Sequence, residues 1–166
     1  MPSGKNVISL DANILLDYLL QHQLNDKDRK NRITKLFHRS NDGNYEIRIF
    51  VYTLGEVFKR LLEPRNNGTM KLDNNEMQKR LKDIQKWVKE KFITPIKIDS
   101  LDQNFHKYYK EIDEKDSLIQ KGDKLTIAAF CADEKSSSFY SFDKGIIQSV
   151  WLQEYVGRFG KKIQEP

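Results

Sequence analysis

Short runs of branched and aromatic residues recur along the chain and are separated by longer stretches with a different apolar period. Runs of this length, bounded by turn residues, are typical of β-strands. They predict strands at residues 6–10, 46–52, 93–98 and 137–142, with a short last strand at 161–164. Pro95 has no N–H to give to a neighbouring strand, so its strand is expected at an edge of the sheet or with Pro95 at its first position.

Between the strands, apolar residues recur every three or four positions, which is the spacing of one face of an α-helix. In the longest of these stretches, residues 73–92, this face includes Leu81, Ile84 and Val88. Further helices are expected directly after the first strand and at residues 29–40, 54–62, 101–114, 123–133 and 146–155. Thr53 is expected to cap the helix at 54–62, and Pro64 to end it.

The alternation of strands and helices predicts the fold class. The strands are apolar enough to be buried on both faces, which favours a mainly parallel sheet of four to five strands inside a three-layer α/β/α sandwich. A length of 166 residues fits a single domain. In such sheets the ligand crevice lies beyond the carboxyl ends of the strands, so functional residues are sought there.

Composition and charge narrow the class of protein. The 9 Phe, 7 Tyr and 2 Trp are enough for a packed core, which excludes a disordered chain. The apolar stretch at residues 7–20 is interrupted by Asp11, Asn13 and Asp17, so neither a signal peptide nor a membrane span is expected. The single Cys131 cannot close an intramolecular disulfide, which favours a reducing, cytoplasmic location. The net charge of +5 is compatible with a polyanionic partner.

Four acidic residues stand close to the ends of strands or the starts of helices. Asp11 directly follows the first strand, and Asp143 ends the fourth. Glu56 lies in the first turn of the helix after the second strand, and Asp123 opens the buried helix that follows Gly122. These places share one edge of a parallel sheet, so the four carboxylates are expected to lie together. Taken singly, each is more often a helix cap or a solvated side chain.

A cluster of carboxylates has a chemical consequence. Two carboxylates about 4 Å apart repel by about 4 kcal/mol at an effective dielectric constant of about 20. Four together must therefore take up protons or bind a cation. Because no His or Cys lies beside these positions, ligation by oxygen alone favours a hard ion, Mg²⁺ or Mn²⁺.

The segments around these acids resemble the four acidic blocks of the PIN domain family of metal-dependent ribonucleases. The matching segments are the first strand with Asp11-Ala12-Asn13, Glu56 in LGEVFKRLL, Gly122-Asp123 before LTIAA, and Ser141-Phe142-Asp143. The resemblance covers about the first 62 residues and residues 122 to about 155. The gap between the second and third blocks is longer than in compact members of the family. It is interpreted as lengthened or inserted helices at about 70–116 within one PIN-like domain, residues 1–166.

The resemblance implies an endoribonuclease that depends on Mg²⁺ or Mn²⁺ and cuts single-stranded or structured RNA with a metal-activated water. The residues that would bind the metal and act in catalysis are Asp11, Glu56, Asp123 and Asp143. Asn13 and Ser141 would support them. Asn13 is equally interpreted as a helix N-cap, and Ser141 as a strand residue that points elsewhere.

Two further acids and one basic stretch have more than one possible role. Asp17 is a further candidate on the first helix, and Asp116 is a rival for the third acidic position, although no apolar helix follows it. The basic stretch at residues 27–39 is either a solvated face or an RNA-contact surface. The arginines that would contact phosphates are Arg29, Arg32 and Arg39.

The resemblance also suggests partners. Many small members of the family are toxins paired with an antitoxin, and others process RNA alone. The expected partners are therefore RNA, a protein antitoxin or regulator, and a second copy of the chain in a homodimer, with no membrane involved.

Two other functions compete with a ribonuclease. One is a catalytically silent PIN-like module that binds RNA or a protein. The other is a phosphatase like the haloacid dehalogenases, which needs a second Asp where this chain has Asn13.

Overall fold

The computed structural model describes residues 4–62, 73–101 and 103–166. Five strands form one sheet in the order β3-β2-β1-β4-β5, and every neighbouring pair is parallel. The strands are β1 Asn6–Leu10, β2 Tyr45–Phe50, β3 Ile93–Ile96, β4 Ser138–Tyr140 and β5 Lys162–Gln164. The predicted parallel α/β fold is confirmed, including the short last strand and the edge position of the strand with Pro95.

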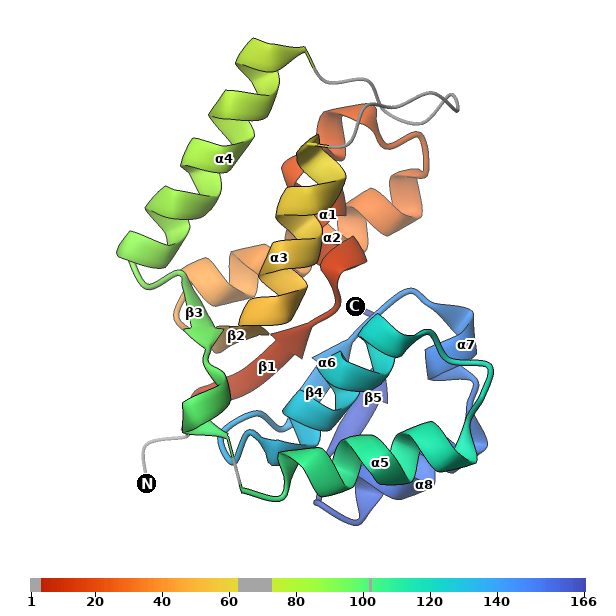
Figure 1. Ribbon diagram of the computed structural model, residues 1–166. Coiled ribbons are helices and arrows are strands. Elements are labelled where there is room, and N and C mark those ends of the chain that lie inside the picture. The colour runs from red at the N-terminus through yellow and green to blue at the C-terminus, as the bar shows by residue number, and fades with distance from the viewer. Residues whose placement is uncertain (1–3, 63–72, 102) are drawn as a thin grey trace.

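Helices cover both faces of the sheet (Figure 1). One face is covered by α1 Ala12–Leu19, α2 Lys27–Asn41, α3 Val51–Leu62 and α4 Asn74–Lys89. The other is covered by α5 Phe105–Lys115, α6 Lys121–Ala132, α7 Lys144–Ile147 and α8 Val150–Gly157. Two short 3-10 helices are η1 Gln21–Gln23 and η2 Ile98–Ser100. Within the described ranges, no helix combines the length and apolar character that a membrane crossing requires.

The sheet separates two hydrophobic cores, as expected for strands buried on both faces. In β2, Ile47 and Ile49 pack into the core with α1 to α4, whereas Phe50 packs beside Phe105 on the other face. The described part of residues 70–116 forms α4, β3, η2 and α5. Its interpretation as lengthened or inserted helices stays a prediction, as does the single domain.

Several helix boundaries differ from the predicted ones, and Pro64, which is expected to end the helix at 54–62, lies outside the described residues. The second strand ends at Phe50 and α3 begins at once at Val51, so the prediction of Thr53 as a helix cap is wrong. The Thr53 hydroxyl lies 3.0 Å from that of Thr126 and joins α3 to α6. The predicted closing helix is divided into α7 and α8, because Ser149 caps a new helix.

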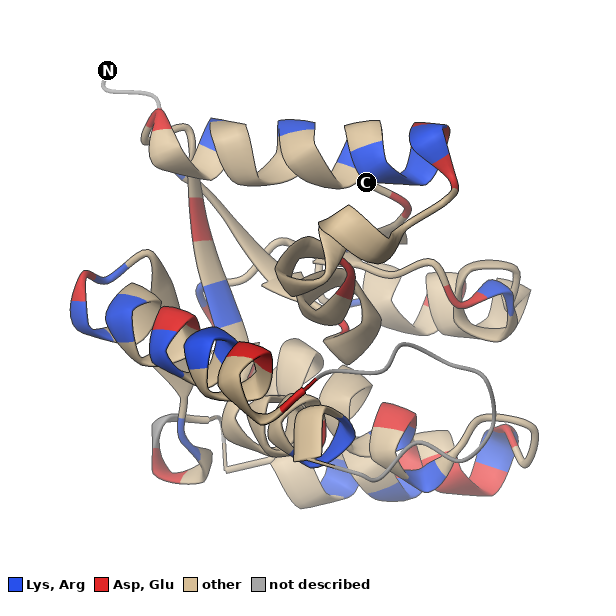
Figure 2. Cartoon of the chain, turned by 90° about the horizontal axis from the view of Figure 1, so that it is seen from above, with Lys and Arg blue, Asp and Glu red and all other residues tan. Residues whose placement is uncertain are grey.

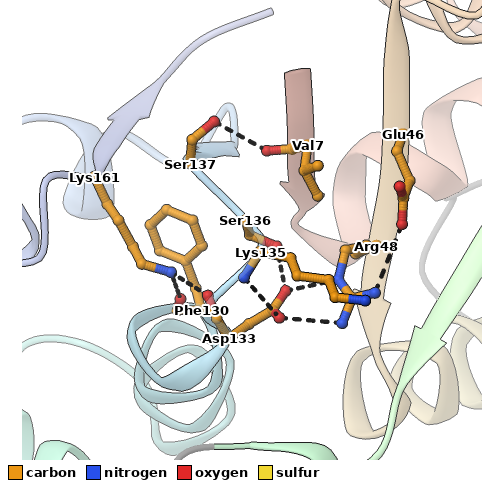
Figure 3. Close-up of polar contacts among 9 residues, drawn as sticks. All are labelled: Val7, Glu46, Arg48, Phe130, Asp133, Lys135, Ser136, Ser137 and Lys161. Carbon is orange, nitrogen blue, oxygen red and sulfur yellow. Dashed lines mark hydrogen bonds and ion pairs between the residues drawn. The ribbon is translucent and has the colours of Figure 1, made fainter. Parts of the chain in front are cut away.

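A buried ion pair joins β2 to the end of α6 (Figure 3). Arg48 donates from Nε and Nη2 to the two carboxylate oxygens of Asp133, at 2.8 and 3.1 Å. The same carboxylate accepts hydrogen bonds from the Ser136 hydroxyl and the Lys135 N–H. Burial alone would raise the pKa of Asp133, but the hydrogen bonds from Arg48 and Ser136 hold it below its usual value.

Lys161, one residue before β5, closes the same end of α6. Its ammonium donates to the backbone oxygens of Phe130, at 2.7 Å, and of Asp133. The last carbonyls of a helix have no partner within the helix, and a cation is favourable beside them. The C-terminal end of α6 is therefore held from β2 by Arg48 and from the start of β5 by Lys161.

Removing the Asp133 carboxylate is expected to destabilise the fold strongly. Asp133→Ala leaves the buried Arg48 with only its longer contact to Glu46, at 3.6 Å, and breaking a buried pair in this way costs about 3–5 kcal/mol. Urea denaturation at pH 7 should show a loss of that size in the free energy of unfolding. Because folding lowers the pKa of Asp133, the difference in the free energy of unfolding between wild type and variant has its full size above the unfolded-state pKa of about 3.9. It disappears as the pH falls through the lower pKa of the folded state.

Glu90→Ala is the matched control for this variant. Glu90 faces Lys86 at 4.0 Å, and both side chains are more than half exposed. Loss of such a surface pair is expected to change the free energy of unfolding by less than about 1 kcal/mol. Equal losses in the two variants would contradict a special contribution from the buried pair.

Candidate functional site

The structure brings the four predicted carboxylates to the carboxyl edge of the sheet. Asp11 directly follows β1, and Asp143 lies three residues after β4, the strand next to β1. Glu56 lies on α3, which follows β2, and Asp123 lies in the first turn of α6. The charges of the other three all act on Asp123, so all three carboxylates lie within electrostatic range of it.

Ser141 joins the two acids that follow strands. Asp11 is 5% exposed, and its Oδ1 accepts a hydrogen bond from the Ala12 N–H at 2.7 Å. Its Oδ2 accepts from the Ser141 hydroxyl at 2.7 Å, and the Ser141 oxygen accepts from the Asp143 N–H at 3.0 Å. Ser141 therefore points into the site, and its alternative as a strand residue that points elsewhere is wrong.

Arg60 is a member of this region that the sequence analysis does not identify. Asp11 is the N-cap of α1, so the interpretation of Asn13 as that cap is wrong. The Asn13 amide oxygen instead accepts a hydrogen bond from Arg60. The charge of Arg60 acts to lower the pKa values of three acids, Asp11, Glu56 and Asp123. The available signal in the sequence is the i,i+4 spacing of Arg60 from Glu56.

Burial and mutual repulsion raise the pKa values of Asp11, Glu56 and Asp123. For Asp123, burial is the largest cause, followed by the charges of Asp11, Asp143 and Glu56, and the pKa reaches about 7. Burial also raises the pKa values of Asp11 and Glu56. The cluster therefore lacks positive charge at neutral pH even with Arg60 beside it, and a bound cation would relieve this deficit.

Gly122 allows Glu56 to lie against the first turn of α6. A Cβ atom at this position would be 2.6 Å from Glu56 Oε1 and 3.4 Å from the Tyr52 ring. Because Oε1 is at the end of a flexible side chain, a larger residue at 122 would displace the carboxylate rather than the backbone. The close approach of Glu56 therefore explains why a glycine precedes Asp123 in the third acidic block.

Asp17 and Arg29 form an ion pair of their own beside the site. Arg29 Nε donates to Asp17 Oδ2 at 2.6 Å, and Arg29 Nη2 lies 2.5 Å from the same oxygen. The guanidinium also lies over the Phe142 ring, 4.4 Å from its centroid. Asp17 thus has a structural partner, and Arg29 lies next to the segment that carries Asp143.

The other two arginines of α2 also have partners within the chain. Arg32 lies 2.8 Å from Glu165 and 2.9 Å from Asp28, and Arg39 donates to the Tyr45 hydroxyl at 3.1 Å. Because Tyr45 begins β2, Arg39 lies toward the amino edge of the sheet, opposite the acids. Figure 2 shows basic residues along most of α2, whereas α4 carries acidic and basic residues together. Contact between α2 and RNA stays a prediction.

The donor set of the site suits a hard divalent cation. Mg²⁺ takes oxygen ligands, commonly one or two carboxylates with water in the remaining positions. In the described part of the chain, however, no three Asp, Glu, His or Cys side chains form a group that could hold a metal ion as they stand. Binding would therefore use fewer protein ligands with water, or would need a side chain to rotate.

Comparison with known proteins supports the fold class. No protein-family model and no curated protein matches the chain. Among solved structures, the fold is similar to that of a chain in the crystal structure of VapBC2 from Rickettsia felis, in which VapBC2 is bound to a DNA fragment from its promoter. The TM-score is 0.60, the match covers 96% of this chain and 98% of that chain, and the sequences are 14% identical. At this identity, the likeness is one of fold alone, and it agrees with the PIN-like fold class expected from the sequence.

The charge arrangement predicts changes of opposite sign in the pKa of Asp123. In the metal-free protein, this carboxyl group is expected to titrate at about pH 7. Asp11→Asn removes a repelling negative charge and should lower the pKa, whereas Arg60→Gln removes a favourable positive charge and should raise it. Carbon-13 NMR of the side-chain carboxyl groups measures both changes.

Glu114→Gln is the control for this titration, because Glu114 is an exposed acid on α5 that does not act on Asp123. In this variant the pKa of Asp123 should be the same as in the wild type. Changes of the same sign in Asp11→Asn and Arg60→Gln would show that the two residues do not flank Asp123 as described.

Proposed function

We propose that this chain is an endoribonuclease dependent on Mg²⁺ or Mn²⁺, with the four-carboxylate cluster as its active site. The observation that carries the proposal is the gathering of four acids at one sheet edge, where burial and repulsion raise the pKa of Asp123 to about 7. Such a cluster attracts a divalent cation. The resemblance of the acidic segments to those of PIN domain ribonucleases and the likeness in fold to a VapBC2 chain support the same function.

The proposed roles follow from the contacts. The residues that would hold the ion are Asp11, Glu56, Asp123 and Asp143. When bound, Mg²⁺ or Mn²⁺ supplies positive charge at the scissile phosphate and lowers the pKa of a water. Ser141 keeps Asp11 in a fixed relation to the backbone of Asp143. Arg60, hydrogen-bonded to Asn13, adds a positive charge where negative charge develops on the phosphate.

Substrate and partners are proposed on separate grounds. The net charge of +5 supports a polyanionic substrate, RNA, and Arg29 of α2 lies over the ring of Phe142, the residue before Asp143. VapBC2 is a complex, which supports a protein partner for this chain, an antitoxin or other regulator, and a homodimer is proposed on the PIN resemblance. A cytoplasmic location is proposed from the single Cys131, whose thiol is buried and has its pKa raised to about 12.

Two observations favour a second candidate, a PIN-like module that binds RNA or protein without cutting. Arg60 already places a positive charge among the acids, and the described side chains do not surround a common metal position. Metal-dependent cleavage distinguishes this module from the nuclease. The phosphatase alternative is supported less, because Asn13 accepts a hydrogen bond from Arg60 and has no carboxyl group to act as an acid.

Loss of one strand-end carboxylate is expected to remove most of the cleavage. Asp11→Asn and Asp143→Asn should each lower kcat/KM on RNA by more than about 100-fold, because even residues that only orient metal ligands are worth about 10–100-fold. EDTA should stop cleavage of RNA by the wild type. The products should carry a 5′-phosphate and a 3′-hydroxyl, because water attacks rather than the 2′-hydroxyl of the RNA. Gel assays with end-group analysis measure both.

Glu114→Gln again serves as the matched control and should cut RNA like the wild type. Cleavage that continues in EDTA, or products that end in 2′,3′-cyclic phosphates, would overturn the proposed mechanism. Tight RNA binding with no cleavage under any metal would favour the silent module.

Metal binding is expected to strengthen with pH around neutrality. Asp123 keeps its proton below about pH 7 in the metal-free chain and must lose it to become a ligand. The affinity for Mn²⁺, measured by isothermal titration calorimetry, should therefore rise about tenfold between about pH 6 and pH 8. Asp123→Asn should bind Mn²⁺ more weakly and without this pH dependence. Wild-type affinity that does not change with pH would exclude Asp123 as a ligand.

A further inference from the structure

A cavity of about 400 Å³ adjoins the acidic cluster at Asp123 and Asp143. It lies between the loop that joins α5 to α6, the start of α6, and α7 with the turn after it, which lie near one another at one end of the molecule (Figure 1). Its lining includes Leu118, Gln120, Asp123, Asp143, Lys144 and Gln148. Because two of these residues belong to the acidic cluster, a ligand with a phosphate at the acids could extend directly into the cavity.

Hydrogen bonds hold the walls of the cavity together. Asp116 Oδ1 accepts from the Leu118 N–H at 3.0 Å, and its Oδ2 accepts from the Ser149 hydroxyl at 3.4 Å, which ties the α5–α6 loop to the start of α8. On the other side, Asp143 Oδ1 accepts from the Gly145 N–H at 2.8 Å and fixes the start of α7. The cavity is therefore largely formed before any ligand enters it. Asp116, considered above as a metal ligand, has a structural role here.

The lining suits a flat heterocycle with polar edges. Leu118, which is 94% exposed, and the buried Ile119 and Ile146 supply apolar surface. The exposed amides of Gln120 and Gln148 each offer both donors and an acceptor, which is what the edges of nucleobases pair with. The volume lies in the range of preformed small-molecule sites, about 300–1,000 Å³. Lys144 adds a positive charge beside the acids.

We infer that this cavity receives the unpaired base of a nucleotide next to the scissile phosphate, so that this base selects the cleavage site. The inference rests on the proposed ribonuclease function. A base in a duplex is stacked and paired and cannot enter such a cavity, whereas the bases of loops and single strands can be turned out. The substrate is therefore RNA that is single-stranded at the cut.

The test uses a synthetic RNA with one mapped cleavage site, in which each nucleotide near the cut is replaced in turn by an abasic residue. With the wild type, removal of the base at one position next to the cut should lower kcat/KM by about tenfold or more. The double variant Gln120→Ala/Gln148→Ala should lose the preference among the four bases at that position. On the abasic RNA it should cut as fast as the wild type, because no base is present for the amides to contact.

A binding measurement separates this inference from the nuclease function. The same RNA, with 2-aminopurine placed at each position in turn, should change its fluorescence on binding in EDTA at one position, and the double variant should lose this change. Gln85→Ala, an exposed glutamine on α4, is the control for both measurements and should behave as the wild type.

Each result decides one of the two claims. Absence of metal-dependent cleavage would overturn the nuclease function, whereas the 2-aminopurine signal would still test the cavity. Cleavage that is insensitive to every abasic position, or that is equal on duplex RNA, would overturn the inference and leave the nuclease standing. Loss of binding to a protein partner in the double variant, with the base preference unchanged, would assign the cavity to that partner and also overturn the inference.

Discussion

The buried pairing of Arg48 with Asp133 determines where α6 lies, and α6 determines where the third acidic block lies. A helix of 12 residues is about 18 Å long and stiff, so fixing its last turn against β2 also positions its first turn. The middle of α6 is apolar and rich in alanine, which lets it pack closely between the sheet and α5. Charged groups at its last turn thus help to set the position of Asp123, together with two contacts nearer to it, Lys124 with Asp113 at 2.9 Å and Thr126 with Thr53 at 3.0 Å.

Opposing electrostatic effects act on the charge of Asp123. The N-terminal end of a helix favours a negative charge, but burial and three neighbouring acids oppose it more strongly. Arg60 reduces this imbalance without removing it. If the chain neutralised all four carboxylates, the site would have little attraction for a cation. The repulsion that weakens the metal-free fold is therefore the same interaction that would give the site its affinity for metal.

Local patterns in the sequence predict the strands, the alternation with helices and the shared edge of Asp11 and Asp143, because both residues come soon after a strand. They do not predict the start of α3, since strand-forming Val51 continues the pattern of β2 into the helix. The hydrogen bond from Arg60 to Asn13 and the pairing of Arg29 with Asp17 are also missed. These contacts depend on how neighbouring helices pack, which residue spacing within one element does not encode.

The two edges of the sheet limit the ways in which another chain can join it. The outer strand β3 contains Pro95, which cannot donate a backbone hydrogen bond, and the opposite edge strand β5 has only three residues. Proline and short length are both features by which proteins discourage the addition of a strand at an edge. Assembly by continuing the sheet from one molecule into the next is therefore disfavoured. A second copy or another protein is expected to bind through the helical layers and loops, with side chains rather than backbone ladders forming the interface.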